Sequence, residues 1–295
     1  MTVSLVYDGS DVRIPEQLGI PRADQMQGSP AEQLSEIAGR TCYDSLGKGR
    51  NSEEYHKHIR EVNHGSVWEH FNYVVKIDWH QAIHMPEVIN RPGLWVTPYL
   101  GGTHVRLCLN LRTAYEWKLH MNDSIGWRLR NAIHSSLEHA APNICNIEHD
   151  IGQMLQWQIV EPEHDEERWV SLFMSGSRGF SHEQVRHKWR TAVSQRSTRY
   201  CDESETSWCE HPLVTQWRIN RAYYYDDDQQ LITRARGEYH FMATELEVWL
   251  ILHGVDKLTA RKQARGAARG YLGNALETEM IFSASTAQWH RMLRH

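Results

Sequence analysis

The stretch "RHKWRTAVSQRSTRY", residues 186–200, combines five Lys or Arg side chains with four Ser or Thr hydroxyls and contains no acid. An exposed helix face usually mixes the two charges, because residues three or four positions apart stabilise it as ion pairs. This stretch therefore predicts a negatively charged partner. Three kinds of partner fit: a nucleic-acid backbone, a phosphorylated small molecule or an acidic protein surface.

Composition narrows this choice. The chain has 295 residues, a net charge of -5 and 40% hydrophobic residues, which is enough for a sizeable core in one large domain or two small ones. A DNA-binding domain usually carries an excess of basic residues, and this acidic chain lacks that excess. We therefore expect a local pocket for a small phosphorylated ligand and no nucleic-acid partner.

The N-terminal sequence and the cysteines predict a cytoplasmic protein with no membrane segment. Residues 1–17 lack the basic start and apolar core of a signal peptide, and no run approaches the roughly 20 apolar residues of a membrane span. The five cysteines are scattered and never form a C-x-x-C pair, which is typical of reduced thiols. His80 and His84 have a metal-like spacing, but "HQAIH" lacks the glutamate of H-E-x-x-H, so we expect no metal site.

Hydrophobic periodicity predicts an α+β domain. Residues 31–64 are expected to be helical, and "FNYVVKIDW" (71–79) alternates as a strand with one buried face does. The segment 80–165 is less regular, apart from an amphipathic stretch at 124–141. Residues 228–253 form the clearest helix, which Gly254 ends, and Asp256 caps a second helix that Gly273 terminates. Helices around a modest sheet are typical of this fold class.

The polar residues of segment 178–200 suit a phosphate group, which is held best by planar guanidinium groups together with hydroxyl donors. The chain has no P-loop and no dinucleotide fingerprint, so side chains must do most of the holding. The alternative is a basic turn that pairs with the acids of "CDESE" (201–205) directly downstream. The polar side chains gathered here are Arg178, Ser181, His182, Arg186, His187, Lys188, Ser194, Arg196, Ser197, Thr198, Arg199 and Tyr200.

Residues 186–200 resemble the signature of flavin-dependent thymidylate synthases, which is R-H-R, seven residues, then a serine, ending in S-x-R-Y. This chain has Arg186-His187-Lys188, eight residues, then Ser197-Thr198-Arg199-Tyr200. Other segments are similar to elements of that family in the same order: "AGRTCYDS" (38–45), "NHGSVWEH" (63–70), "SRGFSHEQVRH" (177–187) and "ARGYLGNALETEM" (268–280). The resemblance covers roughly the first 80 and the last 130 residues.

The resemblance implies a single domain over residues 1–295 with an insertion at about 80–165, built as an antiparallel sheet packed with long helices. It implies a methyltransferase that converts dUMP to dTMP. 5,10-Methylenetetrahydrofolate would supply the carbon, and FAD reduced by NADPH would supply the hydride. It also implies a homotetramer with sites between chains.

The resemblance also implies roles for individual residues. The catalytic candidates are Ser197, Arg199 and Arg294. The candidate dUMP contacts are Glu183, Arg186, Gln195, Arg196, Ser197, Thr198, Arg199 and Arg269. The candidate FAD contacts are His64, Ser66, Arg186, His187, Lys188, Asn110, Arg112 and Arg291.

This sequence departs from the family pattern at several places. Lys188 replaces an arginine, and Trp189 is a one-residue insertion within the signature. The family's N-x-R flavin contact falls on residues 285–287, which read S-T-A, so the "NLR" triplet at 110–112 is the candidate replacement. The family's late substrate arginine falls one position past His295. Either Arg294 substitutes for it, or the chain is trimmed, or this step is altered.

Two other functions stay open. The same fold could carry out a different flavin- and folate-dependent modification of a pyrimidine nucleotide, such as hydroxymethylation, or it could bind a nucleotide without catalysis. A cysteine nucleophile is the mechanistic alternative, and Cys201 lies beside the signature. Nothing near Cys201 in the sequence indicates an activated thiol, so we expect it to be structural.

Overall fold

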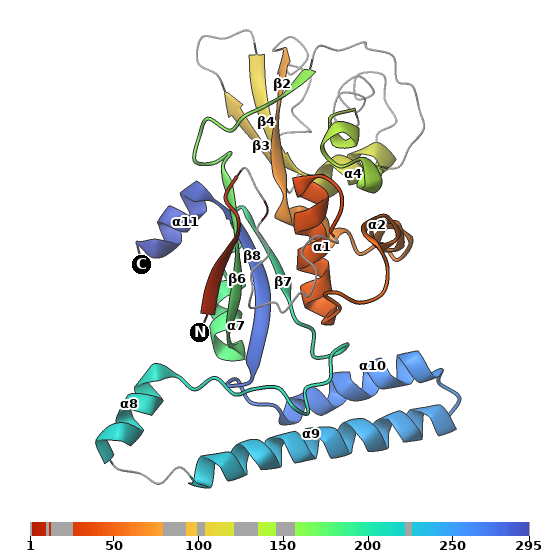
Figure 1. The fold of residues 1–295 in the computed structure, drawn as a ribbon, viewed down its shortest axis with the longest axis vertical. Helices are drawn as coiled ribbons and strands as arrows, with labels where there is room; N and C mark the ends of the chain where they lie inside the picture. Colours follow the sequence, from red (N-terminus) through yellow and green to blue (C-terminus); the bar gives the residue numbers. More distant parts are fainter. Residues whose placement is uncertain are drawn as a thin grey trace.

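The computed structural model describes residues 2–9, 12, 26–78, 93–98, 104–120, 135–145, 157–221 and 226–294. Two four-stranded antiparallel sheets form its centre (Figure 1). Sheet A has the order β1-β6-β8-β7, with bounds Thr2–Tyr7, Trp169–Ser177, Glu277–Ser285 and Thr191–Gln195. Sheet B has the order β3-β4-β2-β5, with bounds Leu94–Pro98, His104–Asn110, Asn72–Asp78 and Trp157–Val160. Together with the helices, these sheets confirm the α+β class.

The strand predicted at 71–79 is β2, one of the two inner strands of sheet B. Tyr73, Val75 and Ile77 enter the core as the alternation predicted. Val74, which points to the opposite face, is also buried, so both faces of β2 are covered at this position. The segment 80–165 therefore supplies the other three strands of sheet B, and residues 79–92, 99–103, 121–134 and 146–156 lie outside the described part.

The helical region predicted at 31–64 consists of α1 (Pro30–Tyr43) and α2 (Ser52–Glu61), and the 3-10 helix η3 (Gly65–His70) follows directly after it. Both α-helices begin with a reciprocal capping box, Ser29 with Glu32 and Asn51 with Glu54, which satisfies free N–H groups at each start. Asp44 ends α1 in a left-handed conformation. α1 packs on β7 and β8 of sheet A, and η3 contacts both α1 and β4 of sheet B.

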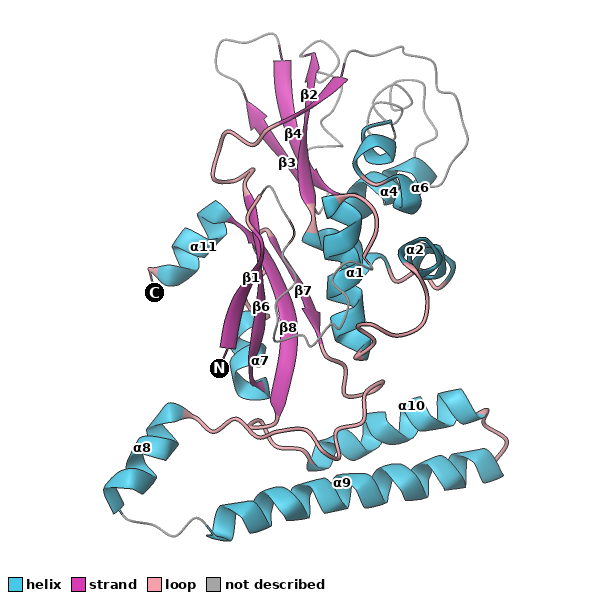
Figure 2. Ribbon diagram, in the orientation of Figure 1, coloured by secondary structure: helices cyan, strands magenta, loops and turns pink. Residues whose placement is uncertain are grey.

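The two long C-terminal helices are α9 (Asp226–Leu252) and α10 (Lys257–Ala268). Gly254 has a φ of 86° and Asp256 accepts from Leu258 N and Thr259 N, so the predicted stop and cap are confirmed. The second helix ends earlier than predicted, at Ala268, because a short 3-10 turn, η4 (Arg269–Tyr271), follows before Gly273. Figure 2 shows this helical hairpin across the end of sheet A that lies away from sheet B.

The remaining described helices are α4 (Leu111–His120), α6 (Pro142–Cys145), α7 (Arg178–Gln184), α8 (Pro212–Arg221) and α11 (Thr286–Leu293). Two larger apolar cores result, one around sheet B and one between α1 and sheet A, and Phe71 packs against both. A smaller cluster of sheet A residues packs against α7 and α11. Among the described helices, none has the length and apolar character needed to cross a membrane.

Candidate functional site

The signature segment, residues 186–200, is organised around strand β7. Ser177 caps α7 by accepting from Phe180 N, and a loop then leads into β7, whose register pairs Thr191 with Ala284 and Gln195 with Met280. A strand rises about 3.3 Å per residue, so β7 separates its two flanking basic groups by a spacer of roughly 13 Å. We call the side that precedes Thr191 the near end and the side that follows Gln195 the far end.

At the far end, the chain turns tightly. Ser197 N donates to Cys42 O (3.0 Å) and Tyr200 N donates to Ser197 O (3.2 Å), while Ser197 Oγ accepts from Arg199 N (3.3 Å). Thr198 is buried and Arg199 is exposed. The predicted catalytic pair Ser197 and Arg199 therefore lies in one turn, with the guanidinium open to solvent.

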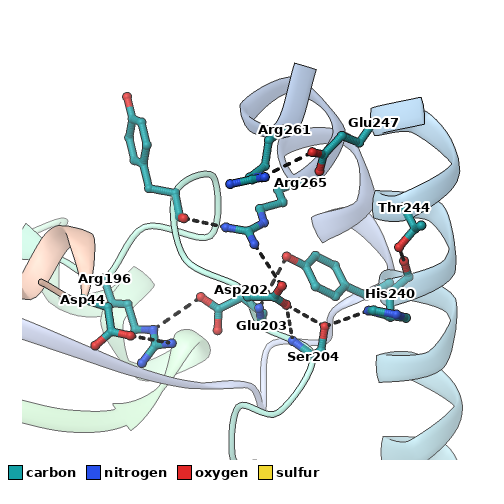
Figure 3. A network of polar contacts seen from close by, with 12 residues as sticks. Asp44, Arg196, Asp202, Glu203, Ser204, His240, Thr244, Glu247, Arg261 and Arg265 are labelled. Atoms are coloured by element: carbon teal, nitrogen blue, oxygen red, sulfur yellow. Dashed lines mark hydrogen bonds and ion pairs between the residues drawn. The ribbon is translucent and has the colours of Figure 1, made fainter. Parts of the chain in front are cut away.

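Two arginines at the far end are already paired with acids (Figure 3). Arg196 lies 3.8 Å from Asp44 and 3.5 Å from the buried Glu203. Arg265 of α10 donates to Asp202 (2.9 Å) and to Tyr200 O (2.7 Å). The acids of "CDESE" thus do pair with cations, as the alternative interpretation of this stretch predicted.

Other predicted nucleotide contacts also lie at this end. Gln195 donates to Ser181 Oγ (3.0 Å) and Thr278 Oγ1 (3.1 Å). Arg269 is exposed. The pKa of Arg178 is lowered mainly by the burial of Arg178 and further by the positive charge of Arg269. Two guanidinium groups close enough to influence each other are an arrangement that suits a multiply charged anion.

A small cavity of about 300 Å³ beside Arg196 has a different character. Four carboxylates line it together with Arg196, and burial is the main cause that raises the pKa of Glu279. This charge balance is unfavourable for a phosphate, which leaves the exposed surface near Arg199 and Arg269 as the far-end position for an anion. The four carboxylates belong to Asp202, Glu205, Glu277 and Glu279.

The "HGSVWEH" element lies along β7. His64 Nδ1 forms a 2.7 Å hydrogen bond with the Tyr43 hydroxyl, and the centres of the Tyr43 and Tyr200 rings are 4.8 Å apart. His64 therefore lies at the far end of β7, away from Lys188. Ser66 is exposed within η3. His70 is fully buried and bonds Ser194 (2.8 Å) and Ser283 (2.7 Å), which ties η3 to the sheet. Burial lowers the pKa of His70 to about 3, so its ring is neutral.

At the near end, the predicted cations are mostly in solvent. Arg186 is 4.0 Å from Glu183, and both side chains are exposed. His187 and Lys188 are exposed too. Lys188 nevertheless lines a larger cavity, of about 580 Å³, in which it faces residues of sheet B and α4.

This larger cavity lies between sheet B and the start of β7, and we call it the inter-sheet cavity. Its volume is in the ordinary range for small-molecule sites. Three predicted FAD contacts converge on it, Lys188, Asn110 and Arg112, although they come from distant parts of the chain. Residues that the sequence analysis did not assign also line it: Glu69, Asn72, Gly93, Leu94, Trp95, Thr113, Glu116, Trp169, Trp189, Arg190 and Thr191.

The C-terminal arginines lie on the side of the near end. α11 follows β8 where β8 pairs with Thr191, and Arg291 of this helix lies 4.4 Å from the Trp189 ring. Arg294 is exposed at the end of α11. Within one chain, the structure therefore does not bring Arg294 to Ser197 and Arg199, its predicted catalytic partners.

The geometry gives little support to a cysteine nucleophile. Cys201 is buried, and burial raises the pKa of its thiol to about 11, so the thiol is protonated at neutral pH and is a poor nucleophile. Within the described ranges, no three His, Cys, Asp or Glu side chains come together as a metal site would require, and His80 and His84 lie outside those ranges.

Comparison with known proteins shows that part of the chain is similar to a known family. Residues 170–295 match the family model described as "Thymidylate synthase complementing protein". The flavin-dependent thymidylate synthase of Mycolicibacterium gilvum is 30% identical over 132 residues, and that of Mycobacterium avium is 32% identical over 131 residues. Each match covers 42% of this chain and 48% of the relative, so the chain spans about half the length of the curated relatives it matches. The resemblance to flavin-dependent thymidylate synthases is confirmed over residues 170–295.

Solved structures add a weaker likeness. A thymidylate synthase from Helicobacter pylori, solved with FAD and dUMP, is 16% identical, with coverage of 43% of this chain and 57% of that chain. The TM-score is 0.23, which does not establish a common overall arrangement.

Proposed function

We propose that this protein transfers a one-carbon unit to the uracil ring of dUMP and yields dTMP, with FAD as cofactor. The observation that carries the proposal is that the family match, residues 170–295, contains the whole signature segment 186–200. On this proposal, 5,10-methylenetetrahydrofolate supplies the carbon and NADPH the reducing equivalents. Bound flavin supplies the hydride, while the protein supplies binding and orientation.

We assign the nucleotide phosphate to the far end. Arg199 and Arg269 are exposed cations there, and Ser197 and Thr198 add hydroxyl groups within the same turn. Arg196 and Gln195 already have partners, so they orient the turn or exchange those partners for the ligand. The exposed pair Glu183 and Arg186 remains a candidate at the other end.

We assign the flavin to the near end, where the inter-sheet cavity fits such a group. Lys188, Asn110 and Arg112 line the cavity, and Arg291 packs on Trp189 at its wall. Solvent-shielded donors without partners in the described residues also line it, which is what an acceptor-rich ligand requires. His187 extends the basic surface, and His64 and Ser66 are then available to a flavin held by a neighbouring chain.

The separation of the two ends supports a homotetramer with sites built from more than one chain. A hydride passes between atoms only about 3–3.5 Å apart, and β7 keeps the two ends of one chain much farther apart. Residues Leu231, Phe241, Trp249 and Leu252 of α9 are more than half exposed, which gives an apolar surface for association. Arg294 of one chain can then reach Ser197 and Arg199 of another. Light scattering that yields only the 34.5 kDa chain mass for an active, flavin-loaded sample would contradict this assembly.

On the same proposal, residues 1–295 form one domain with an insertion at about 80–165, since Phe71 packs against both cores. A cytoplasmic location is consistent with five cysteines that form no disulfide.

The direct test is anaerobic turnover of the purified protein with dUMP, methylenetetrahydrofolate and NADPH, analysed by mass. A yellow protein that yields dTMP supports the proposal. A yellow protein that yields a hydroxymethylated nucleotide favours the modified-product alternative. A colourless protein that added FAD does not restore favours a nucleotide-binding homologue without catalysis.

A further inference from the structure

The walls of the inter-sheet cavity carry hydrogen-bond donors that have no acceptor. Within the described part of the chain, Trp169 Nε1, Asn72 Nδ2, and Arg190 Nε and Nη1 are shielded from solvent and have no hydrogen-bond partner. Trp169 is 5% exposed and Asn72 9%. All three residues line the cavity. Because buried polar atoms in folded proteins are almost always paired, these donors point to acceptor groups on a ligand.

The charge balance of the cavity favours an anion. The two carboxylates that line the cavity, Glu69 and Glu116, both form ion pairs with Arg112. Lys188 and Arg190 are then two lining cations that have no ion pair among the described residues. Fixed cations in a partly enclosed site attract oxyanions.

The position of Arg190 is specific. Its Nη2 donates to Cys108 Sγ (3.2 Å), but burial raises the pKa of that thiol to about 11, so the sulfur carries no counter-charge at neutral pH. Arg190 also has a φ of 49°, a conformation that is unfavourable for a residue with a side chain. Such strained positions concentrate where a side chain must be presented to a ligand.

The tryptophans of the cavity provide flat walls. The guanidinium of Arg190 lies 5.1 Å from the centre of the Trp95 ring. The Trp95 and Trp189 rings are 6.3 Å apart and nearly perpendicular. Aromatic faces of this kind pack against planar rings and leave the polar edge of the ring to the donors.

We propose that the inter-sheet cavity binds a ligand in which an oxyanion is attached to a flat heteroaromatic body, with Arg190 as the counter-ion of the oxyanion. Trp169 and Asn72 donate to further acceptors of the same ligand. Arg190, Trp169 and Asn72 thereby become binding residues. The cavity walls that come from sheet B and α4 lie outside residues 170–295, so the family match does not account for them. The identity of the ligand rests on the proposed function, in which FAD, a reduced folate and dUMP all share this chemistry.

The test is a set of fluorescence titrations on the full-length protein, since three tryptophans line the cavity. FAD, 5-formyltetrahydrofolate and dUMP are each added to wild type and to Arg190→Gln. We expect Arg190→Gln to weaken at least one of them about tenfold or more, as for loss of a charge-assisted contact. Arg190→Lys, which keeps the charge, should weaken it less. Trp169→Phe, which removes the indole N–H together with part of the ring, should also reduce affinity. Arg50→Gln, an exposed arginine away from the cavity, is the matched control.

The ligand that is weakened identifies the occupant. An effect on FAD or folate alone agrees with the placement of dUMP at the far end. An effect on dUMP supports the cavity and contradicts that placement. The proposal is overturned if all three affinities stay within about twofold of wild type, or if none of the ligands quenches the wild-type protein. Turnover of dUMP decides the proposed function separately, so the two can fail independently. Urea denaturation of Arg190→Gln verifies that the variant is folded.

Discussion

The two ends of β7 carry similar positive charge in different settings. At the far end, Arg196 lies against Asp44 and Glu203, so its charge is compensated within the fold. At the near end, Arg190 lines the inter-sheet cavity and has no carboxylate partner among the described residues. Two of its guanidinium nitrogens are buried and have no hydrogen-bond acceptor there. A single basic run in the sequence therefore contains both arginines that pair with acids of the fold and cations that are free to bind a ligand. Only their positions in the fold distinguish the two kinds.

The largest expected effect tests the compensated end. Glu203→Gln leaves Arg196 partly buried without its closer acid, and breaking a buried ion pair from one side costs about 3 kcal/mol. We therefore expect the free energy of unfolding, measured in urea, to fall by that amount. The exposed neighbour Glu205→Gln is the control and should change stability by less than about 0.5 kcal/mol. Equal small effects for both variants would mean that the far-end arginines are not structural counter-ions.

A second effect tests whether the far end also binds a ligand. Arg199 is exposed, so Arg199→Ala should change stability by less than about 0.5 kcal/mol. A charge-assisted contact to phosphate is worth roughly 1.5–3 kcal/mol, so dUMP should bind about tenfold more weakly or worse. Calorimetry on Arg199→Ala and on Lys57→Ala, a surface control on α2, makes the measurement. An unchanged dUMP affinity would remove Arg199 from the site.

A third effect concerns the middle of β7, where His70 joins Ser194 to Ser283. Burial lowers the pKa of His70 to about 3 and that of His56 to about 4. Between pH 6.5 and about 4 the unfolded chain therefore binds protons at both positions that the folded chain does not bind. The contribution of the two neutral histidines to the free energy of unfolding is therefore fully present above pH 6.5. It should fall as the pH drops, by up to about 1.4 kcal/mol per pH unit for each histidine.

Urea denaturation at several pH values between 6.5 and 5 measures this slope. His70→Gln should make the slope shallower by up to one proton, whereas the exposed His182→Gln should leave it unchanged. The same slope in both variants would show that His70 is protonated in the folded protein. Since His70 contacts the strand between the two ends, its protonation should loosen both ends together.

Local signals explain what the sequence predicted well. Gly254 and Asp256 define the turn between α9 and α10 through backbone conformation and capping, which depend on immediate neighbours. The alternation around Tyr73 and Ile77 identified β2 for the same reason. The partners of β2 come from about 30 and 85 residues downstream, and no local pattern encodes that pairing.

The site was predictable in its elements and not in its arrangement. The signature and the "NLR" triplet could be found, because each is a short motif. The inter-sheet cavity could not, because it joins Trp95 to Arg190 across 95 positions of sequence. Arg190 counted only as one charge in a basic run. Its left-handed backbone and its missing partners are properties of the folded chain.

The strand pairings also fix the order in which the two sheets can close during synthesis. All described strands of sheet B lie between residues 72 and 160, so its ladder is complete once that stretch has left the ribosome. Sheet A has to wait, because β6 and β7 both pair with β8, which begins at Glu277, and β1 at the start of the chain pairs only with β6. The N-terminal strand thus remains exposed through most of translation, and the walls of the inter-sheet cavity come together only when the last strand is added.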